Sequence, residues 1–246
     1  MAVSVGKWTK YNVMKKDPWL AQAVPPTQLL TYKTFQLFLN RYREVFLKPS
    51  VGEMGAGVVH VRAGGGGKRI YEFHSGNRRV MILGTKRAYN YFCRYLKVKG
   101  KRYIIQQKVN LLKINNCPFD FRVMVQRKNV NSPWSVTAIA AKVAARHYVT
   151  TNVAAKVLTF EEAIRQSSLY SKDLKALEKE VKSIALRTAS VLQKKYPHHR
   201  RFGIDMGIDY SGKVWIIEAN YRGSNNIFLF LKDKAMYERV LEYDHG

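Results

Sequence analysis

The residues best suited to chemistry lie near the C-terminus, where Asp205, Glu218 and Asn220 stand within two runs of alternating apolar residues. These runs, 203–209 and 214–220, flank a sequence typical of a tight turn, which predicts a β-hairpin. A loop of four residues would place Asp205 opposite Glu218, so that their carboxylates repel each other. A divalent cation between them removes that conflict, because Asp, Glu and Asn supply the hard oxygen ligands that Mg²⁺ prefers. We therefore expect a magnesium site on this hairpin.

The same register predicts which hairpin residues face the core. It pairs Met206 with Ile217 and Ile208 with Trp215 on one wholly apolar face. Asp209 lies about 13 Å along the strand from the first carboxylate, so we expect it to belong to the turn. The alternative is an exposed polar edge without a metal. The chain has only 17 acidic residues against 43 basic ones, so several acids on one face favour the metal site.

A second candidate site lies in the N-terminal half of the chain. Lys48 ends a predicted strand and stands just before a loop that contains Gly52, Gly55 and Gly57. Glycines let backbone N–H groups approach phosphate oxygens, and a lysine adds a positive charge. The arrangement does not match the phosphate loop GxxxxGK[ST], and it does not open a helix. An ordinary glycine hairpin with a surface lysine is the alternative.

Composition limits the classes of protein. The 246 residues are 46% hydrophobic, which excludes an intrinsically disordered chain, and no apolar run is long enough to span a membrane. Cys93 and Cys117 are the only cysteines, and we expect both to be reduced in a cytoplasmic protein without a signal peptide. The net charge of +26 indicates an anionic partner. Because the basic residues are dispersed and no nucleic-acid motif accompanies them, we favour other anions over direct nucleic-acid binding.

The elements that would position these residues follow from spacing and turn signals. Residues 1–26 are expected to be irregular because they contain Asp17-Pro18 and Pro25-Pro26. The helical spacing of Phe35, Phe38, Leu39 and Tyr42 predicts a helix that Thr31 caps. A second helix is predicted that Thr85 caps, with Cys93 on its apolar face. Short strands are predicted at 45–49, 58–62, 69–74, 79–83, 102–109, 120–127 and 134–144.

A capping box of Thr159 and Glu162 predicts a helix start. A long amphipathic helix is then indicated by apolar residues recurring at spacings of three and four from Leu174 to Val191, and it should end before Pro197.

At this point the chain resembles the ATP-grasp superfamily, and within it the spore-coat-associated YheC/YheD-like proteins. The matching stretches occur in the expected order: 24–27, 46–49 with its glycine loop, 103–107, 118–126, 151–152, 203–205 and 217–220. The resemblance implies an α+β fold in which two α+β subdomains hold ATP between them. It divides the chain into an N-terminal segment and helix (1–44), a small glycine-loop subdomain (45–110) and a metal-binding subdomain (111–246). The usual N-terminal domain before the ATP-grasp core is not evident.

The resemblance also implies roles for single residues. Lys48 and Lys7 would contact phosphates, and Asp205, Glu218 and Asn220 resemble the Mg²⁺ ligands. The hinge whose backbone reads adenine would be Gln106, Gln107, Lys108 and Val109. Arg122 and Asn152 resemble residues that face the phosphates and the reactive acyl group. Lys142 is placed with them, at a position where such chains typically have an arginine.

Three functions remain open from the sequence. The first is an ATP- and Mg²⁺-dependent ligase that activates a carboxylate, for example on an anionic peptide, as an acyl phosphate for attack by an amine. The second is a non-catalytic protein of the same fold whose basic surface docks on an anionic assembly, such as a spore layer or nucleic acid. The third is a kinase that uses the same site. A partner protein could supply the domain that is not evident.

Overall fold

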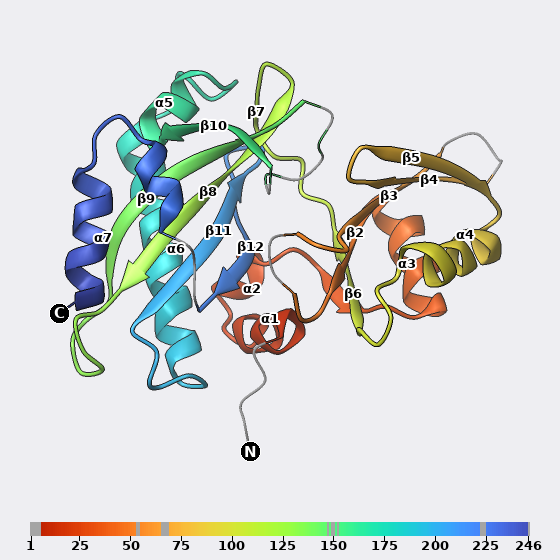
Figure 1. Cartoon of the computed structure of the whole chain (residues 1–246), viewed down its shortest axis with the longest axis horizontal. Helices are drawn as coiled ribbons and strands as arrows, with labels where there is room; N and C mark the ends of the chain where they lie inside the picture. Colours follow the sequence, from red (N-terminus) through yellow and green to blue (C-terminus); the bar gives the residue numbers. More distant parts are fainter. Residues whose placement is uncertain are drawn as a thin grey trace.

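A computed structural model describes residues 6–52, 55–64, 69–146, 148, 151, 153–221 and 225–245. Two antiparallel sheets dominate it, and the large sheet lies beside the small one (Figure 1). The small sheet has the strand order β1-β6-β2-β3-β4-β5, and the large sheet has the order β10-β9-β8-β11-β12, with β7 paired to β8.

The small sheet is built from the first half of the chain. Its strands are β1 (Thr27–Leu29), β2 (Glu44–Pro49), β3 (Val59–Ala63), β4 (Ile70–Ser75), β5 (Arg78–Leu83) and β6 (Tyr103–Gln107). Helix α3 (Tyr32–Tyr42) buries Phe35, Phe38 and Leu39 against one face of this sheet. It starts after Thr31, whose hydroxyl accepts a hydrogen bond from the Thr34 N–H, so the predicted cap is confirmed.

The second helix of this unit differs from the prediction. Gly84, with φ of 88°, is the N-cap of α4 (Thr85–Tyr91), while the buried Thr85 hydroxyl lies 2.8 Å from that of Tyr71. The chain then continues as a π-helical turn, Phe92–Leu96. Phe92 continues the buried face of Thr85 and Ala88 at helical spacing, whereas Cys93 lies at the edge of that face and is exposed. The predictions that Thr85 caps the helix and that Cys93 belongs to the core are therefore wrong.

The exposed Cys93 leads to a simple prediction. A thiol reagent should label Cys93 rapidly in the native protein and the half-buried Cys117 more slowly. Mass spectrometry of the digested, labelled protein measures both rates. The variant Cys93→Ser should lose the rapid phase and change the free energy of unfolding by less than about 0.5 kcal/mol. Equal labelling rates would contradict the greater exposure of Cys93.

The large sheet has different cover on its two faces. Its strands are β7 (Lys113–Ile114), β8 (Cys117–Gln126), β9 (Ser135–Ala144), β10 (Ala154–Thr159), β11 (Arg201–Ile208) and β12 (Val214–Asn220). One face buries Val123, Ile139 and Ile204 beneath α5 (Phe160–Arg165) and the long α6 (Leu174–Gln193). The opposite face is covered in part by the 3-10 helix η2 (Asn226–Phe230) and by α7 (Ala235–His245), which pack on Met124 and Ala140 (Figure 1).

The N-terminal segment is helical, so the prediction of an irregular segment over 1–26 is wrong. Helix α1 (Lys7–Lys15) buries Tyr11 and Met14, and a short α2 (Leu20–Ala23) follows it. Pro18 lies between these helices and Pro25-Pro26 follow α2, so the prolines lie outside both helices and do not prevent them. Between them, the Asp17 carboxylate accepts a hydrogen bond from the Leu20 N–H at 3.0 Å and pairs with Arg187 of α6 at 2.7 Å.

The second half follows the sequence pattern more closely. The strands predicted at 120–127 and 134–144 correspond to β8 and β9, and the Thr159 and Glu162 side chains form the capping box of α5. Strand β10, η2 and α7 have no counterpart among the predicted elements. No helix in the described part of the chain is long and apolar enough to cross a membrane.

Candidate functional site

The carboxylate hairpin forms with the predicted pairing at one end and a different one at the other. Asp205 faces Glu218, as predicted. The register then shifts by one residue, so Met206 faces Ile216 and Ile208 faces Val214. The predicted pairs of Met206 with Ile217 and of Ile208 with Trp215 are therefore wrong.

The shift is a β-bulge in β12, with Ile217 as the extra residue. Val214 and Ile216 belong to the buried core, whereas Ile217 and Glu218 both line the cavity above the sheet. Without the bulge, strict alternation would have turned Glu218 and Asn220 toward the same side as Val214. Because of the bulge, the apolar residues at the start of the strand face the core while the polar residues at its end face the cavity.

Asp209 belongs to the turn, as predicted. Its carboxylate accepts hydrogen bonds from the backbone N–H groups of Ser211 and Lys213 and from Trp215 Nε1 at 2.8 Å. Burial raises the pKa of Asp209, but these hydrogen bonds outweigh it and lower the pKa.

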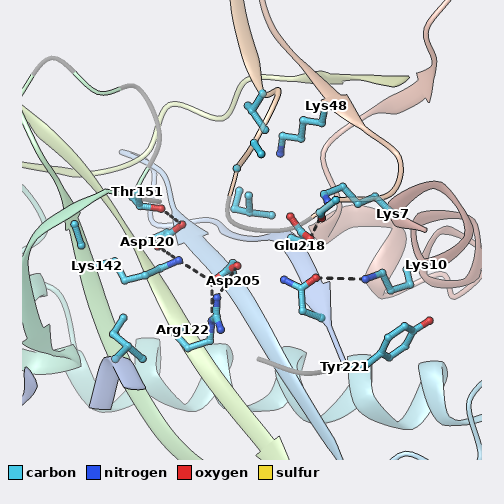
Figure 2. Close-up of a pocket in the computed structure, with 18 of the residues that line it drawn as sticks. Lys7, Lys10, Lys48, Asp120, Arg122, Lys142, Thr151, Asp205, Glu218 and Tyr221 are labelled. Atoms are coloured by element: carbon cyan, nitrogen blue, oxygen red, sulfur yellow. Dashed lines mark hydrogen bonds and ion pairs between the residues drawn. The ribbon is translucent and has the colours of Figure 1, made fainter. Parts of the chain in front are cut away.

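Asp205 lies at the centre of a buried network of charges. Arg122 of β8 donates two hydrogen bonds to its two carboxylate oxygens, at 2.9 and 3.2 Å. Lys142 of β9 donates a third at 2.8 Å (Figure 2). Burial alone would raise the pKa of Asp205, but the charges of Lys142 and Arg122 dominate and lower it. Asp205 is therefore held ionised between two cations from neighbouring strands.

A second buried carboxylate, Asp120, extends this network. Its Oδ1 lies 3.1 Å from Lys142 Nζ, and its Oδ2 accepts a hydrogen bond from the Thr151 hydroxyl (Figure 2). Burial raises the pKa of Asp120 despite the nearby Lys142. Asp120 stands two residues before Arg122 on one strand, so alternation could have placed both on one face from sequence.

Glu218 and Asn220 meet lysines from the N-terminal helix. Lys7 Nζ lies 3.2 Å from Glu218 Oε1 and donates to the Gly52 carbonyl at 2.7 Å. Lys10, one helical turn later, lies 3.5 Å from Asn220 Oδ1 (Figure 2). Lys10 was not predicted, although its spacing of three from Lys7 places both on one helix face.

The three predicted metal ligands thus share one side of the sheet, and each has a basic neighbour. No group of three or more His, Cys, Asp or Glu side chains suited to a metal occurs among the described residues. A cation here would need the Asn220 amide oxygen beside the two carboxylates. Arg122 and Lys142 use three of the roughly four lone pairs of Asp205, which leaves Glu218 and Asn220 as the more open donors.

The small sheet places Lys48 and part of the glycine loop at the same cavity. Gly52 and Gly55 line it, whereas Gly57, with φ of 74°, serves the turn. A Cβ on Gly57 would lie 2.8 Å from the Tyr103 hydroxyl, so a larger residue would not fit.

Several backbone groups of the predicted hinge, 106–109, already form hydrogen bonds within the protein, so only part of the hinge is available to bind a base. The Gln107 N–H donates to the Pro26 carbonyl at 2.9 Å, and the Lys108 N–H donates to the Glu44 carbonyl at 3.1 Å. Gln106 lies in β6 between β1 and β2, so it pairs on both sides. The Lys108 ammonium contacts Glu44 at 2.7 Å, and Lys108 does not line the cavity, whereas Gln106, Gln107 and Val109 do. Asn152 lies outside the described residues.

The structure therefore gathers most of the predicted residues around one cavity of about 2160 Å³ between the two sheets. Small-ligand pockets are usually about 300–1,000 Å³, so this cavity has room for two ligands. Among its described lining residues, eight are Lys or Arg and four are Asp or Glu. Such an excess of positive charge suits a polyanion such as a nucleoside triphosphate.

Comparison with curated proteins identifies two relatives, both from Bacillus subtilis (strain 168). The chain is 29% identical over 252 residues to endospore coat-associated protein YheD, which covers 96% of this chain and 53% of the relative. It is 23% identical over 219 residues to endospore coat-associated protein YheC, with coverage of 87% and 58%. The chain thus spans little more than half the length of these relatives.

Solved structures show the same fold. D-cycloserine synthetase DcsG superposes with a TM-score of 0.57 at 12% identity, over 98% of this chain and 69% of that one. N5-carboxyaminoimidazole synthetase from Staphylococcus aureus, in a complex with ADP, gives 0.55 at 13% identity, over 98% and 52%. These identities support the fold alone.

The family model described as YheC/D-like ATP-grasp matches residues 3–244, which is nearly the whole chain. The match confirms the resemblance drawn from the ordered motifs and agrees with the α+β architecture of two sheets around one cavity. The chain therefore belongs to the YheC/D-like family of ATP-grasp proteins.

Proposed function

We propose that this chain binds Mg-ATP in the cavity and activates a carboxylate as an acyl phosphate, which an amine then attacks. One observation carries the proposal. Lys48 and the glycine loop of the small sheet face the same cavity as Asp205, Glu218 and Asn220 of the large sheet. A phosphate chain can therefore lie between cationic and oxygen-donor groups from two different sheets. The structural neighbours are synthetases, one of them with ADP bound, which agrees with this proposal.

The phosphates would be held by residues of the small sheet and of α1. Lys48 is buried and lines the cavity, and Lys7 joins the glycine loop to Glu218. Backbone N–H groups of a glycine loop bind phosphate oxygens without a side chain in the way. The adenine would contact Val109 and the apolar side chains of Phe46, Leu111 and Ile217, all of which line the cavity.

The oxygen donors fit a magnesium ion. Glu218 and Asn220 would be its main protein ligands, with Asp205 as a third that Arg122 and Lys142 hold in place. When bound, the ion would neutralise charge on the phosphates and orient them for transfer. Lys7 contacts Glu218 and Lys10 contacts Asn220. Both ammonium groups would therefore have to move away from the metal ligands or turn toward the phosphates when the ion binds.

Arg122 and Lys142 would act on the transferred phosphoryl group and on the acyl group. Both line the cavity and are fixed by Asp205, so their charges are oriented before a ligand arrives. Fixed charges stabilise a transition state without the cost of reorganising at the moment of reaction. The proposed carboxylate substrate includes an anionic peptide, because the cavity and the net charge of +26 both favour anions.

The test begins with binding of Mg-ATP to the pure protein, followed by phosphate release with a panel of amino acids, dicarboxylates and acidic peptides. Hydroxylamine traps an acyl phosphate as a hydroxamate, and mass spectrometry of the products separates ligation from phosphorylation of a hydroxyl group. The expected result is hydroxamate that depends on both ATP and the carboxylate. Absence of Mg-ATP binding would refute the proposal, and a phosphorylated alcohol would identify a kinase.

Two broader features belong to the same proposal. Because both relatives are described as endospore coat-associated, we propose that this chain acts at or near a spore layer. Because the chain spans little more than half of each relative, we also propose that a further protein segment completes the acceptor side of the site. Recovery of acceptor-dependent turnover on adding a purified partner would test the second point.

A further inference from the structure

Three buried residues of the small sheet form a chain of hydrogen bonds that ends at Lys48. Lys48 Nζ donates to Gln106 Oε1 at 2.6 Å, and Gln106 Nε2 donates to Thr27 Oγ1 at 3.0 Å. The Thr27 hydroxyl donates in turn to the Pro25 carbonyl at 2.8 Å. Lys48, Gln106 and Thr27 are 8%, 7% and 2% exposed, so water has little access to these bonds.

The donors and acceptors in this series of hydrogen bonds can be assigned in only one way, because the series ends at the Pro25 carbonyl. A carbonyl only accepts, so the single proton of the Thr27 hydroxyl is committed to Pro25. The hydroxyl oxygen must then accept from the Gln106 amide nitrogen, which turns the amide oxygen toward Lys48. Thus a backbone carbonyl three hydrogen bonds away decides that Lys48 meets an acceptor and not a second donor.

The strand order brings these residues together. Strand β6 lies between β1 and β2, with Thr27 facing Gln106 on one side and Phe46 facing Gln106 on the other. Lys48 stands two residues after Phe46, so it lies diagonally across from Gln106 on the same face. Each polar atom of the Gln106 side chain has a partner within the protein, so the orientation of the amide is fixed before a ligand arrives.

We propose that Gln106 and Thr27 are positioning residues, which hold the Lys48 ammonium in place for the phosphates of a bound nucleotide. The proposal rests on the nucleotide-binding role of Lys48 given above. Gln106 is neutral, so it fixes the ammonium without cancelling its charge, as a carboxylate in the same place would. One of the three N–H bonds of Lys48 is used, and two remain for phosphate oxygens.

The charges around Lys48 make this positioning necessary. Burial lowers the pKa of Lys48 to about 8. Glu218 of β12, Asp205 of β11 and Asp120 of β8 raise that pKa, whereas Lys7 of α1 lowers it further. An acceptor fixed beside the ammonium favours its charged form, which is the form that binds phosphate.

The experiment measures the affinity of the full chain for the Mg²⁺ complex of the non-hydrolysable analogue AMP-PNP by calorimetry. Gln106→Leu should weaken binding about 10- to 100-fold, because a hydrogen bond to a charged group is lost. Thr27→Val should weaken it up to about tenfold, because the amide is then free to turn its NH₂ group toward Lys48. Thr27→Ser keeps the hydroxyl and should restore the affinity of the wild type.

The pH dependence of nucleotide binding is a second measurement, and it would not change if Gln106 had only a structural role. In the wild type, affinity should fall as pH rises through about 8, as Lys48 loses its proton. In Gln106→Leu the charged form loses its acceptor, so the fall should begin at a lower pH. In Gln106→Glu a negative partner favours the charged form, so the fall should move to a higher pH, with weaker binding throughout.

Thr188→Val is the matched control. Thr188 is also a fully buried threonine whose hydroxyl donates to a backbone carbonyl, that of Ile184 at 2.8 Å, but it lies in α6 away from the cavity. Equal loss of affinity in Thr27→Val and Thr188→Val, or an unchanged pH profile in Gln106→Leu, would overturn the positioning role. A wild type that does not bind Mg-AMP-PNP would refute the proposed function itself, and the positioning role with it.

Discussion

Replacing Asp205 with alanine is expected to lower the free energy of unfolding by about 3–5 kcal/mol. The substitution leaves Arg122 and Lys142 buried without the carboxylate that accepts three hydrogen bonds from them. Most of the lost stability comes from leaving two buried cations beside each other without a counter-ion. The lost attraction between Asp205 and these cations contributes less. Urea unfolding followed by circular dichroism at neutral pH measures the difference.

The control is Asp173→Ala, which removes an exposed carboxylate that caps α6 and should cost only about 1 kcal/mol. A pH series adds a second check. Because the folded protein lowers the pKa of Asp205 below its ordinary value of 3.8, its stabilising effect is present above that value and is lost as pH falls below it. The difference in the free energy of unfolding between the wild type and Asp205→Ala should therefore become smaller at acidic pH. A difference below about 1 kcal/mol at neutral pH would show that the network contributes little to the fold.

Glu218→Gln is expected to abolish nucleotide turnover while the fold survives. The substitution keeps the size of the side chain but removes one of the charges that would hold a divalent cation. The loss should exceed the roughly 10–100-fold effect of changing an outer-shell partner of a metal. The side chain of Glu218 is 22% exposed, and its pairing with Lys7 is correspondingly modest in energy. Mn²⁺ affinity by paramagnetic resonance and Mg-ATP-dependent phosphate release are the two measurements.

Glu161→Gln provides the comparison, because Glu161 is exposed on α5 and pairs only with Arg165 among the described residues. It should leave both measurements unchanged. If Glu218→Gln binds Mn²⁺-nucleotide as tightly as the wild type, the assignment of this carboxylate to a metal is wrong. Binding without any turnover in the wild type would then favour a non-catalytic protein that docks on an anionic assembly.

Local patterns in the sequence predicted the pairs that depend on neighbouring residues. The capping box located the start of α5. An assumed four-residue turn placed Asp205 opposite Glu218; the actual turn is one residue longer, and the bulge at Ile217 restores that pair. The ion pairs of Asp205 were not predicted, because they depend on β8, β9 and β11 being adjacent. That adjacency joins residues as far apart as Arg122 and Asp205, and no local pattern records it.

The errors have separate physical causes. Asp17-Pro18 and Pro25-Pro26 suggested an irregular start, but α1 packs on α6 and is stabilised by that tertiary contact more than by its own propensity. Cys93 was placed on the core face because it stands four residues after Tyr89, but the buried Thr85, Ala88 and Phe92 leave it at the edge of that face, where it is exposed. Most of the residues that the family resemblance implied line one cavity, but the resemblance gave no role to the side chain of Gln106.

The bulge at Ile217 gives β12 one residue more than its pairing with β11 requires. Loss of Ile217 would restore strict alternation, so Glu218 and Asn220 would keep the cavity side and Ala219 would keep its place in the core. One inserted residue has no such slack, because it must either enlarge the bulge or exchange the two sides at the end of the strand. Deletion of Ile217 should therefore be tolerated better than insertion of a residue beside it.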